Sequence, residues 1–108
     1  MTTISHKELL KKFIQQLDEE KFYDAHESLE AIWFPRRFEE SDEVKLLKGF
    51  INAAVCFELI KKGRLSSSEK VWETYLKYKP LLHVVDSKYT KEYHTIALHV
   101  EKIKESYI

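Results

Sequence analysis

The stretch between Leu46 and Ile60 constrains the fold of this chain more than any other, because it is apolar on almost every side of a helix. Its polar exceptions are Lys48, Asn52 and Glu58. A helix that is apolar all round must be covered all round by other parts of the protein. We therefore expect a helix over residues 43–62 at the centre of a helical bundle, beginning at Ser41 or Asp42 and ending at Gly63.

Turn residues and apolar spacing predict the remaining elements. The chain has only two glycines and two prolines, too few for the many turns of a sheet protein. Ser5 with Glu8 and Ser66 with Glu69 have the spacing of capping boxes. Helices are expected over residues 6–17, 20–33, 43–62, 68–78 and from 90 onward, while residues 81–85 fit either a helix or an extended segment. The sequence predicts an all-α fold, a compact bundle of about five helices with a buried central helix, as a single domain over residues 1–108.

Charge and composition bear on partners and location. Eighteen basic residues balance eighteen acidic ones, so the electrostatic reason to expect a nucleic acid or an anionic membrane as a partner is missing. The only cysteine, Cys56, lies in the apolar run and is interpreted as a small buried hydrophobe. The first residues lack the pattern of a signal peptide, and no stretch approaches the roughly 20 apolar residues of a membrane span. We expect a cytoplasmic protein with no nucleic acid partner and no membrane.

The segment over residues 22–33 places polar side chains beside an apolar helix face. At about 100° per residue, five side chains share one arc: Phe22, His26, Leu29, Glu30 and Trp33. His26 and Glu30 are then one turn apart at the border of the buried face, and Glu27 lies farther round. Because an unpaired buried charge is costly, these polar groups are expected to be half exposed or paired inside the fold.

The central helix offers partners for these groups. Lys48, Asn52, Val55 and Leu59 recur along one stripe of it, so Lys48 or Asn52 is expected to contact Glu30 or His26. The candidate polar or metal site comprises His26, Glu27, Glu30, Lys48 and Asn52. The structural core is assigned to Phe22, Leu29, Trp33, Ile51 and Val55.

This constellation has two interpretations. In the first, it is a hydrogen-bond network that holds two helices together. In the second, His26 and Glu30 face one divalent metal ion and Glu27 adds a carboxylate, similar to the His-Glu-x-x-His zinc helix but with Glu30 in place of the second His. The sequence selects no third ligand among His83, His94 and His99. Buried polar networks are commoner than metal sites without a recognisable ligand set, so we favour the network and expect no cofactor.

The same residues carry a resemblance to a known family. The matching positions are Phe22, Ala25, His26, Glu27, Leu29, Glu30, Trp33, the run Gly49-Phe50-Ile51-Asn52-Ala53-Ala54, and Gly63. They resemble the domain-of-unknown-function family numbered 309, small helical proteins with an Ala-His-Glu-x-Leu-Glu-x-x-Trp motif and a later Gly-Leu-Ile-Gln-x-Ala-like helix. The chain departs from the pattern at Asn52, Leu59 and Arg64. The resemblance implies a small helical fold and no established reaction.

Two functions follow as expectations. One is a non-enzymatic helical binding or scaffolding domain, and the other is a metal-dependent or acid–base, hydrolase-like protein that uses His26, Glu27 and Glu30. A homodimer is also expected, because apolar residues lie on more than one side of the helix over residues 68–78. Phe34 and Phe38 beside Arg36 and Arg37 add an aromatic and arginine mix of the kind enriched at interfaces.

Overall fold

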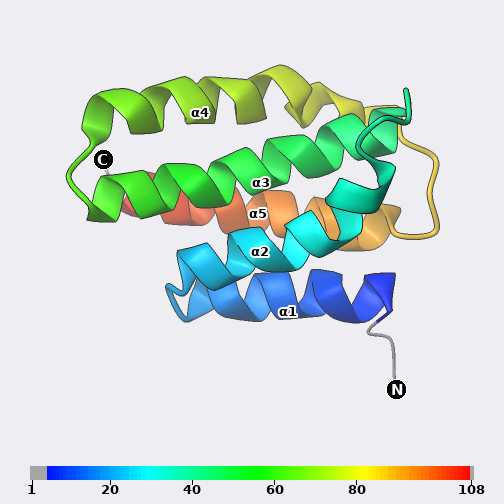
Figure 1. The fold of residues 1–108 in the computed structure, drawn as a ribbon, viewed down its shortest axis with the longest axis horizontal. Coiled ribbons are helices and arrows are strands. Elements are labelled where there is room, and N and C mark those ends of the chain that lie inside the picture. The colour runs from blue at the N-terminus through cyan, green and yellow to red at the C-terminus, as the bar shows by residue number, and fades with distance from the viewer. Residues whose placement is uncertain (1–4, 108) are drawn as a thin grey trace.

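The computed structural model describes residues 5–107, and within them five α-helices surround one core (Figure 1). The elements are α1 (His6–Asp18), α2 (Phe22–Trp33), α3 (Asp42–Lys61), α4 (Leu65–Tyr78) and α5 (Thr90–Ser106), with the 3-10 helices η1 (Phe34–Arg36) and η2 (Lys79–His83). The predicted all-α bundle is confirmed. The segment left open over residues 81–85 is mostly the second half of η2.

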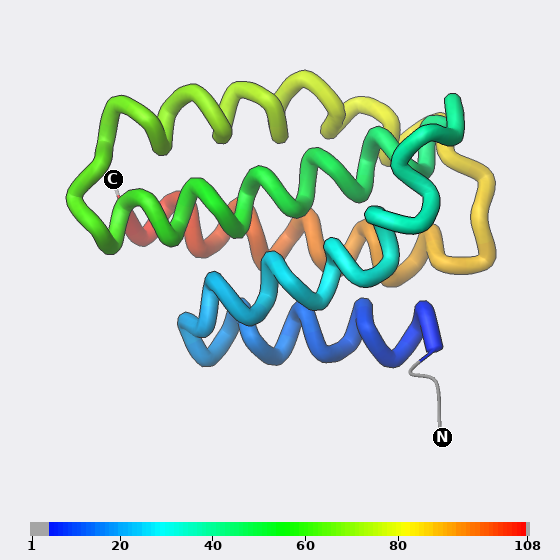
Figure 2. Tube along the Cα trace, in the orientation of Figure 1, coloured from blue at the N-terminus to red at the C-terminus, as the bar shows by residue number. Residues whose placement is uncertain are grey.

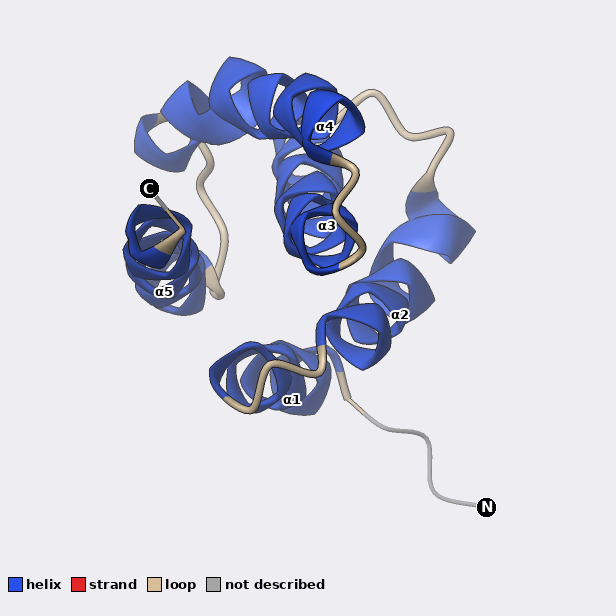
Figure 3. Cartoon of the chain, turned by 90° about the vertical axis from the view of Figure 1, so that its left-hand side faces the viewer, coloured by secondary structure: helices blue, strands red, loops and turns tan. Residues whose placement is uncertain are grey.

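Helix α3 is the central helix, as its apolar composition predicts. It packs against α2, α4 and α5, and the end-on view shows it between α4 and α2, with α1 and α5 closing the other side of the core (Figure 3). Helices α3 and α4 approach closely at Gly49, where an added Cβ would lie 3.1 Å from Cβ of Tyr78. Fully buried side chains line the length of α3: Leu46, Leu47, Phe50, Ala53, Ala54, Cys56 and Phe57.

Each α-helix runs opposite to the one before it, which the trace makes plain (Figure 2). The connections between α1 and α2 and between α3 and α4 are three residues long, the length that joins antiparallel helices. The start of α2 therefore lies beside the end of α3, and the rings of Phe22 and Phe57 meet there with centroids 5.2 Å apart. This register decides which polar residues meet.

Local capping groups are found at the starts of α1 and α3 and after the end of α3. The Ser5 hydroxyl accepts a hydrogen bond from the backbone N–H of Glu8 at 3.2 Å, and Ser41 accepts one from Val44 at 3.1 Å. Gly63 has a φ of +75°, a left-handed conformation that suits glycine after a helix. Ser5 therefore marks the start of α1, and Ser41 and Gly63 mark the two ends of α3.

Two predicted boundaries are wrong. Helix α4 begins at Leu65, and Arg64 precedes it without a side-chain cap, so the capping box of Ser66 with Glu69 does not form. Ser68 is buried inside the first turn and donates its hydroxyl to the carbonyl of Leu65 at 2.6 Å. Helix α2 begins two residues later than predicted, because Glu20 has a φ of +59° that no helix accommodates.

The predicted core residues lie inside the bundle. Phe22, Leu29 and Ile51 are buried, while Trp33 and Val55 are partly buried and pack against the core. Cys56 is buried as expected, and that burial raises the pKa of its thiol to about 11. No helix in residues 5–107 combines the length and apolarity that crossing a membrane requires.

Candidate functional site

A polar cluster surrounds His26, on the side of α2 that faces the end of α3. Its Nε2 is 3.1 Å from a carboxylate oxygen of Glu30, one turn along α2, and its Nδ1 is 3.7 Å from Oε1 of Glu58 on α3. The side chains of His26 and Glu58 are 20% and 15% exposed, against 44% for Glu30. His26 is thus held between a sheltered carboxylate and a half-exposed one.

The partner from α3 is Glu58, and neither Lys48 nor Asn52 takes that place. The Asn52 side-chain amide donates to the carbonyl of Lys48 at 2.8 Å within α3, and Lys48 is exposed. The antiparallel register explains the difference, since His26 near the start of α2 lies beside the last turns of α3. Glu58 is visible in the sequence as a charged residue in an apolar run, but no local pattern pairs it with His26.

Glu27 lies on the outer side of this cluster. It is exposed, and its hydrogen bond with the Tyr23 hydroxyl, together with its negative charge, raises the pKa of Tyr23. The Tyr23 ring meets His26 edge-on, with centroids 5.6 Å apart. Tyr23 therefore connects Glu27 to the cluster, while the Glu27 carboxylate itself faces solvent.

One pair of atoms in the cluster is incompletely satisfied. Nδ1 of His26 and Oε1 of Glu58 are buried and have no hydrogen-bond partner among the described residues. Their separation of 3.7 Å is too long for a hydrogen bond but within range of a charge attraction. Each ring nitrogen of His26 therefore faces a carboxylate, Nε2 that of Glu30 and Nδ1 that of Glu58.

The other candidate metal ligands, His83, His94 and His99, contact different side chains. His83 and His94 lie together, with ring centroids 6.1 Å apart, and His99 pairs with Asp18 at 2.8 Å between Nδ1 and Oδ1. Within residues 5–107, no group of three or more His, Cys, Asp or Glu side chains has a geometry that could hold a metal ion.

A second polar network, not predicted from the sequence, centres on Glu43 near the start of α3. Its Oε2 accepts hydrogen bonds from the hydroxyls of Tyr93 at 2.6 Å and Ser87 at 2.7 Å, and its Oε1 accepts from Arg36 at 3.1 Å. Burial alone would raise the pKa of Glu43, but these hydrogen bonds and the charge of Arg36 outweigh it and hold the pKa below its ordinary value. Glu43 thus joins α3 to η1, to α5 and to the loop before α5.

His6 extends this network to α1. Its Nε2 is 3.1 Å from the Tyr93 hydroxyl, and its ring stacks on Tyr89 with centroids 3.9 Å apart. Burial lowers the pKa of His6, Glu43 opposes that shift, and Arg36 adds to it. Burial and the hydrogen bond to Glu43 raise the pKa of Tyr93. The network therefore links α1 and α5 to the central helix α3.

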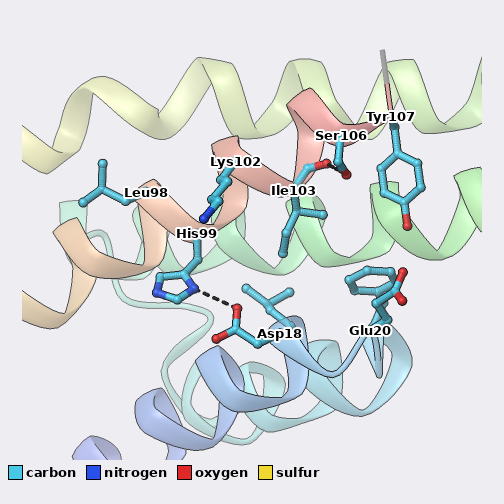
Figure 4. A pocket seen from close by; sticks show the side chains of 10 residues that line it. Asp18, Glu20, Leu98, His99, Lys102, Ile103, Ser106 and Tyr107 are labelled. Atoms are coloured by element: carbon cyan, nitrogen blue, oxygen red, sulfur yellow. Dashed lines mark hydrogen bonds and ion pairs between the residues drawn. The ribbon is translucent and has the colours of Figure 1, made fainter.

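A groove opens at the other end of the bundle, between the end of α1, the start of α2 and the last turns of α5 (Figure 4). Its volume is about 620 Å³. Leu17, Phe22, Ile103 and Leu98 supply its apolar part, and Leu98 is exposed. Its polar part includes Asp18 and Glu20 on the α1–α2 side, and Lys102 and His99 on the α5 side. The groove therefore offers an apolar surface between walls of different charge.

The comparison with known proteins gives one match. The family model described as Domain of unknown function (DUF309) matches residues 10–71, more than half of the chain. That span includes α2, α3 and the whole His26 cluster, together with the α1–α2 side of the groove. No curated protein and no solved structure matches the chain.

Proposed function

The chain belongs to the family described as Domain of unknown function (DUF309), and we propose that it is a small non-enzymatic helical binding domain. The observation that carries the proposal is the groove between α1 and α5. Its volume of about 620 Å³ lies within the range of about 300–1,000 Å³ for ligand sites. Its mixture of apolar and charged walls is of the kind that receives an amphipathic helix of a partner protein.

The charges of the two walls define the partner. Asp18 and Glu20 line the α1–α2 side, and Lys102 lines the α5 side. Part of this charge is already engaged, since Asp18 pairs with His99 and Glu20 is 3.7 Å from Lys61. The fitting occupant is a helix with an apolar stripe over Leu98 and Ile103, basic residues on one flank and an acidic residue on the other.

In this proposal the His26 cluster has a structural role. His26 stands between Glu30 on its own helix and Glu58 on α3, so it links α2 to the central helix through charge. Helix α2 also supplies Phe22 to the groove, beside Leu17 of α1. His26, Glu30 and Glu58 do not line the groove, so the cluster joins the helices without touching the ligand.

The test is selection from a displayed library of helical peptides on the intact protein, with counter-selection on Leu98→Glu. Leu98 is exposed, so this change should alter the groove and leave the fold intact. Val84→Glu is the matched control, because Val84 is also an exposed apolar residue but does not line the groove. We expect enriched peptides with an apolar stripe and a basic flank that bind the wild type and Val84→Glu but not Leu98→Glu. No enrichment, or equal retention by Leu98→Glu, would contradict the proposal.

A second candidate function rests on the buried pair of His26 Nδ1 and Glu58 Oε1, which lack a hydrogen-bond partner among the described residues. A divalent ion or an acid–base role for His26, Glu27 and Glu30 would use that uncompensated polarity. The metal content of protein purified without a polyhistidine tag separates the two candidates. A stoichiometric ion that disappears in His26→Gln supports the second candidate, and its absence supports the first.

A further inference from the structure

Phe34, Arg37 and Phe38 form an exposed aromatic and arginine surface at η1. The Arg37 guanidinium lies over the Phe34 ring, 3.7 Å from its centroid, and 4.5 Å from the centroid of Phe38. Its Nη1 donates to the carbonyl of Phe34 at 2.6 Å. Phe38 is 85% exposed and Phe34 is 54% exposed. The three side chains are ordered against one another, although two large rings remain in water.

Arg37 differs from its neighbour Arg36 in its charged partners. Arg36 is engaged with Glu39 and Glu43, at N–O distances of 3.1 Å. Arg37 has no carboxylate within ion-pair distance among the described residues, and Glu40, which is exposed, has no cation partner within them. One unpaired charge of each sign therefore stands on each side of Phe38 in the sequence Arg37-Phe38-Glu39-Glu40.

This segment is complementary to itself. In an antiparallel pairing of two copies about a two-fold axis, Arg37 of each copy faces Glu40 of the other, and the Phe34 and Phe38 rings of both copies meet between the two ion pairs. We propose that this surface is a homodimer interface and that its partner is a second copy of the chain. Phenylalanine and arginine are enriched at interfaces, and a closed two-fold arrangement is the commonest one for a self-complementary surface.

The size of the surface limits the strength of the dimer. Each aromatic side chain buries about 150–250 Å² at most, so the four rings of two copies give at most about 600–1,000 Å² in total, below the roughly 1,200 Å² at which stable specific interfaces begin. We expect a weak dimer whose population depends on concentration. The surface lies at the opposite end of the bundle from the end of α5, so it is independent of the groove (Figure 1).

Sedimentation equilibrium over a concentration series that reaches the millimolar range tests the interface. The wild type should move from the 12.9 kDa chain mass toward twice that mass as concentration rises. Arg37→Glu and Glu40→Arg should each stay at the chain mass, because each places like charges opposite one another. Lys70→Glu, a charge reversal at an exposed position on α4, should dimerise like the wild type.

The decisive sample is an equal mixture of Arg37→Glu and Glu40→Arg. In the mixed pair both ion pairs re-form with their charges exchanged, so the mixture should associate although neither variant does so alone. A wild type that keeps the chain mass at every concentration would overturn the proposal. So would a mixture that stays monomeric, or single variants that dimerise like the wild type.

Discussion

The two sheltered carboxylates of α3 differ in the number of hydrogen bonds that they accept. Glu43, near its start, receives hydrogen bonds from Tyr93, Ser87 and Arg36. Glu58, near its end, keeps a buried oxygen with no hydrogen-bond partner among the described residues and approaches only His26, at 3.7 Å. Both side chains are about equally sheltered, at 17% and 15% exposed. Burial alone therefore does not explain the difference.

What differs is the number of elements that converge on each carboxylate. Glu43 is reached from η1, α5 and the loop before α5, whereas Glu58 is approached from α2 alone. Hydrogen bonds to a charged group contribute about 1.5–3 kcal/mol each, and stranding their donors costs a similar amount. The Glu43 network at the start of α3 is thus the more stabilising of the two, although the residues that stand out in the sequence lie near the other end of the helix.

The largest expected effect is that of Glu43→Ala. Removing the carboxylate takes away the acceptor of the Tyr93 and Ser87 hydroxyls and one of the two carboxylates that pair with Arg36, so the free energy of unfolding should fall by about 3 kcal/mol or more. Urea unfolding measures it. Tyr93→Phe keeps the ring but removes the hydroxyl that contacts both Glu43 and His6, so it should lose about 1–2 kcal/mol. A Glu43→Ala variant as stable as the wild type would show that the network is dispensable.

Low pH should weaken the Glu43 network. The pKa of Glu43 in the folded chain lies below its ordinary value of 4.5, so its contribution to stability is complete above pH 4.5. As the pH falls below 4.5 toward the folded pKa, the unfolded chain binds a proton that the folded chain resists, and the free energy of unfolding decreases. Burial lowers the pKa of His6 below 6.5, which adds a loss of the same sign just below pH 6.5.

The variant Glu43→Gln isolates the carboxylate part of this dependence. It lacks the titrating group, so its free energy of unfolding should be lower at neutral pH and should fall less steeply below pH 4.5. Urea unfolding at a series of pH values measures both curves. Parallel curves for the wild type and Glu43→Gln would refute the assignment.

A smaller effect is expected for Glu30→Ala. Glu30 is 44% exposed and pairs with His26 across one turn of the same helix, so solvent screens the interaction. The free energy of unfolding should fall by less than about 1 kcal/mol. A loss as large as that of Glu43→Ala would mean that the His26 cluster contributes as much to stability as the Glu43 network.

The smallest effect should come from Glu58→Gln. It removes a sheltered charge whose Oε1 accepts no hydrogen bond from the described residues, so the lost attraction to His26 is offset by a lower desolvation cost. We expect the change in the free energy of unfolding, measured in urea, to be smaller than that of Glu43→Ala or Glu30→Ala. The same substitution at Glu43 is the matched comparison, and an equal loss at both positions would erase the difference between the two ends of α3.

The fold could be predicted from the sequence because its main determinants are local. The apolar run from Leu46 to Ile60 required a covered helix, and Ser5, Ser41 and Gly63 mark helix ends through contacts within a few residues. The start of α4 was mispredicted because Ser66 and Glu69 have the spacing of a capping box, but burial of Ser68 requires an earlier start.

The candidate site was predictable only in part. His26 and Glu30 are one turn apart on a helix, so their pairing follows from spacing alone. The contact between Glu58 and His26 depends on the register between α2 and α3, which apolar periodicity does not specify. Ser87 and Tyr93 lie 44 and 50 residues from Glu43, so no local pattern connects them. The groove is built from both ends of the described chain and exists only once α5 packs beside α1.

The most direct test of the central claim, that the groove and not the His26 cluster is the binding site, is the affinity of one selected helical peptide for three proteins. These are the wild type, Leu98→Glu and His26→Gln, each shown to be folded. Leu98→Glu should weaken binding by at least about tenfold, equivalent to about 1.4 kcal/mol, whereas His26→Gln should leave the affinity unchanged. Loss of binding in a folded His26→Gln protein, with Leu98→Glu unaffected, would place the binding site at the cluster and contradict the account.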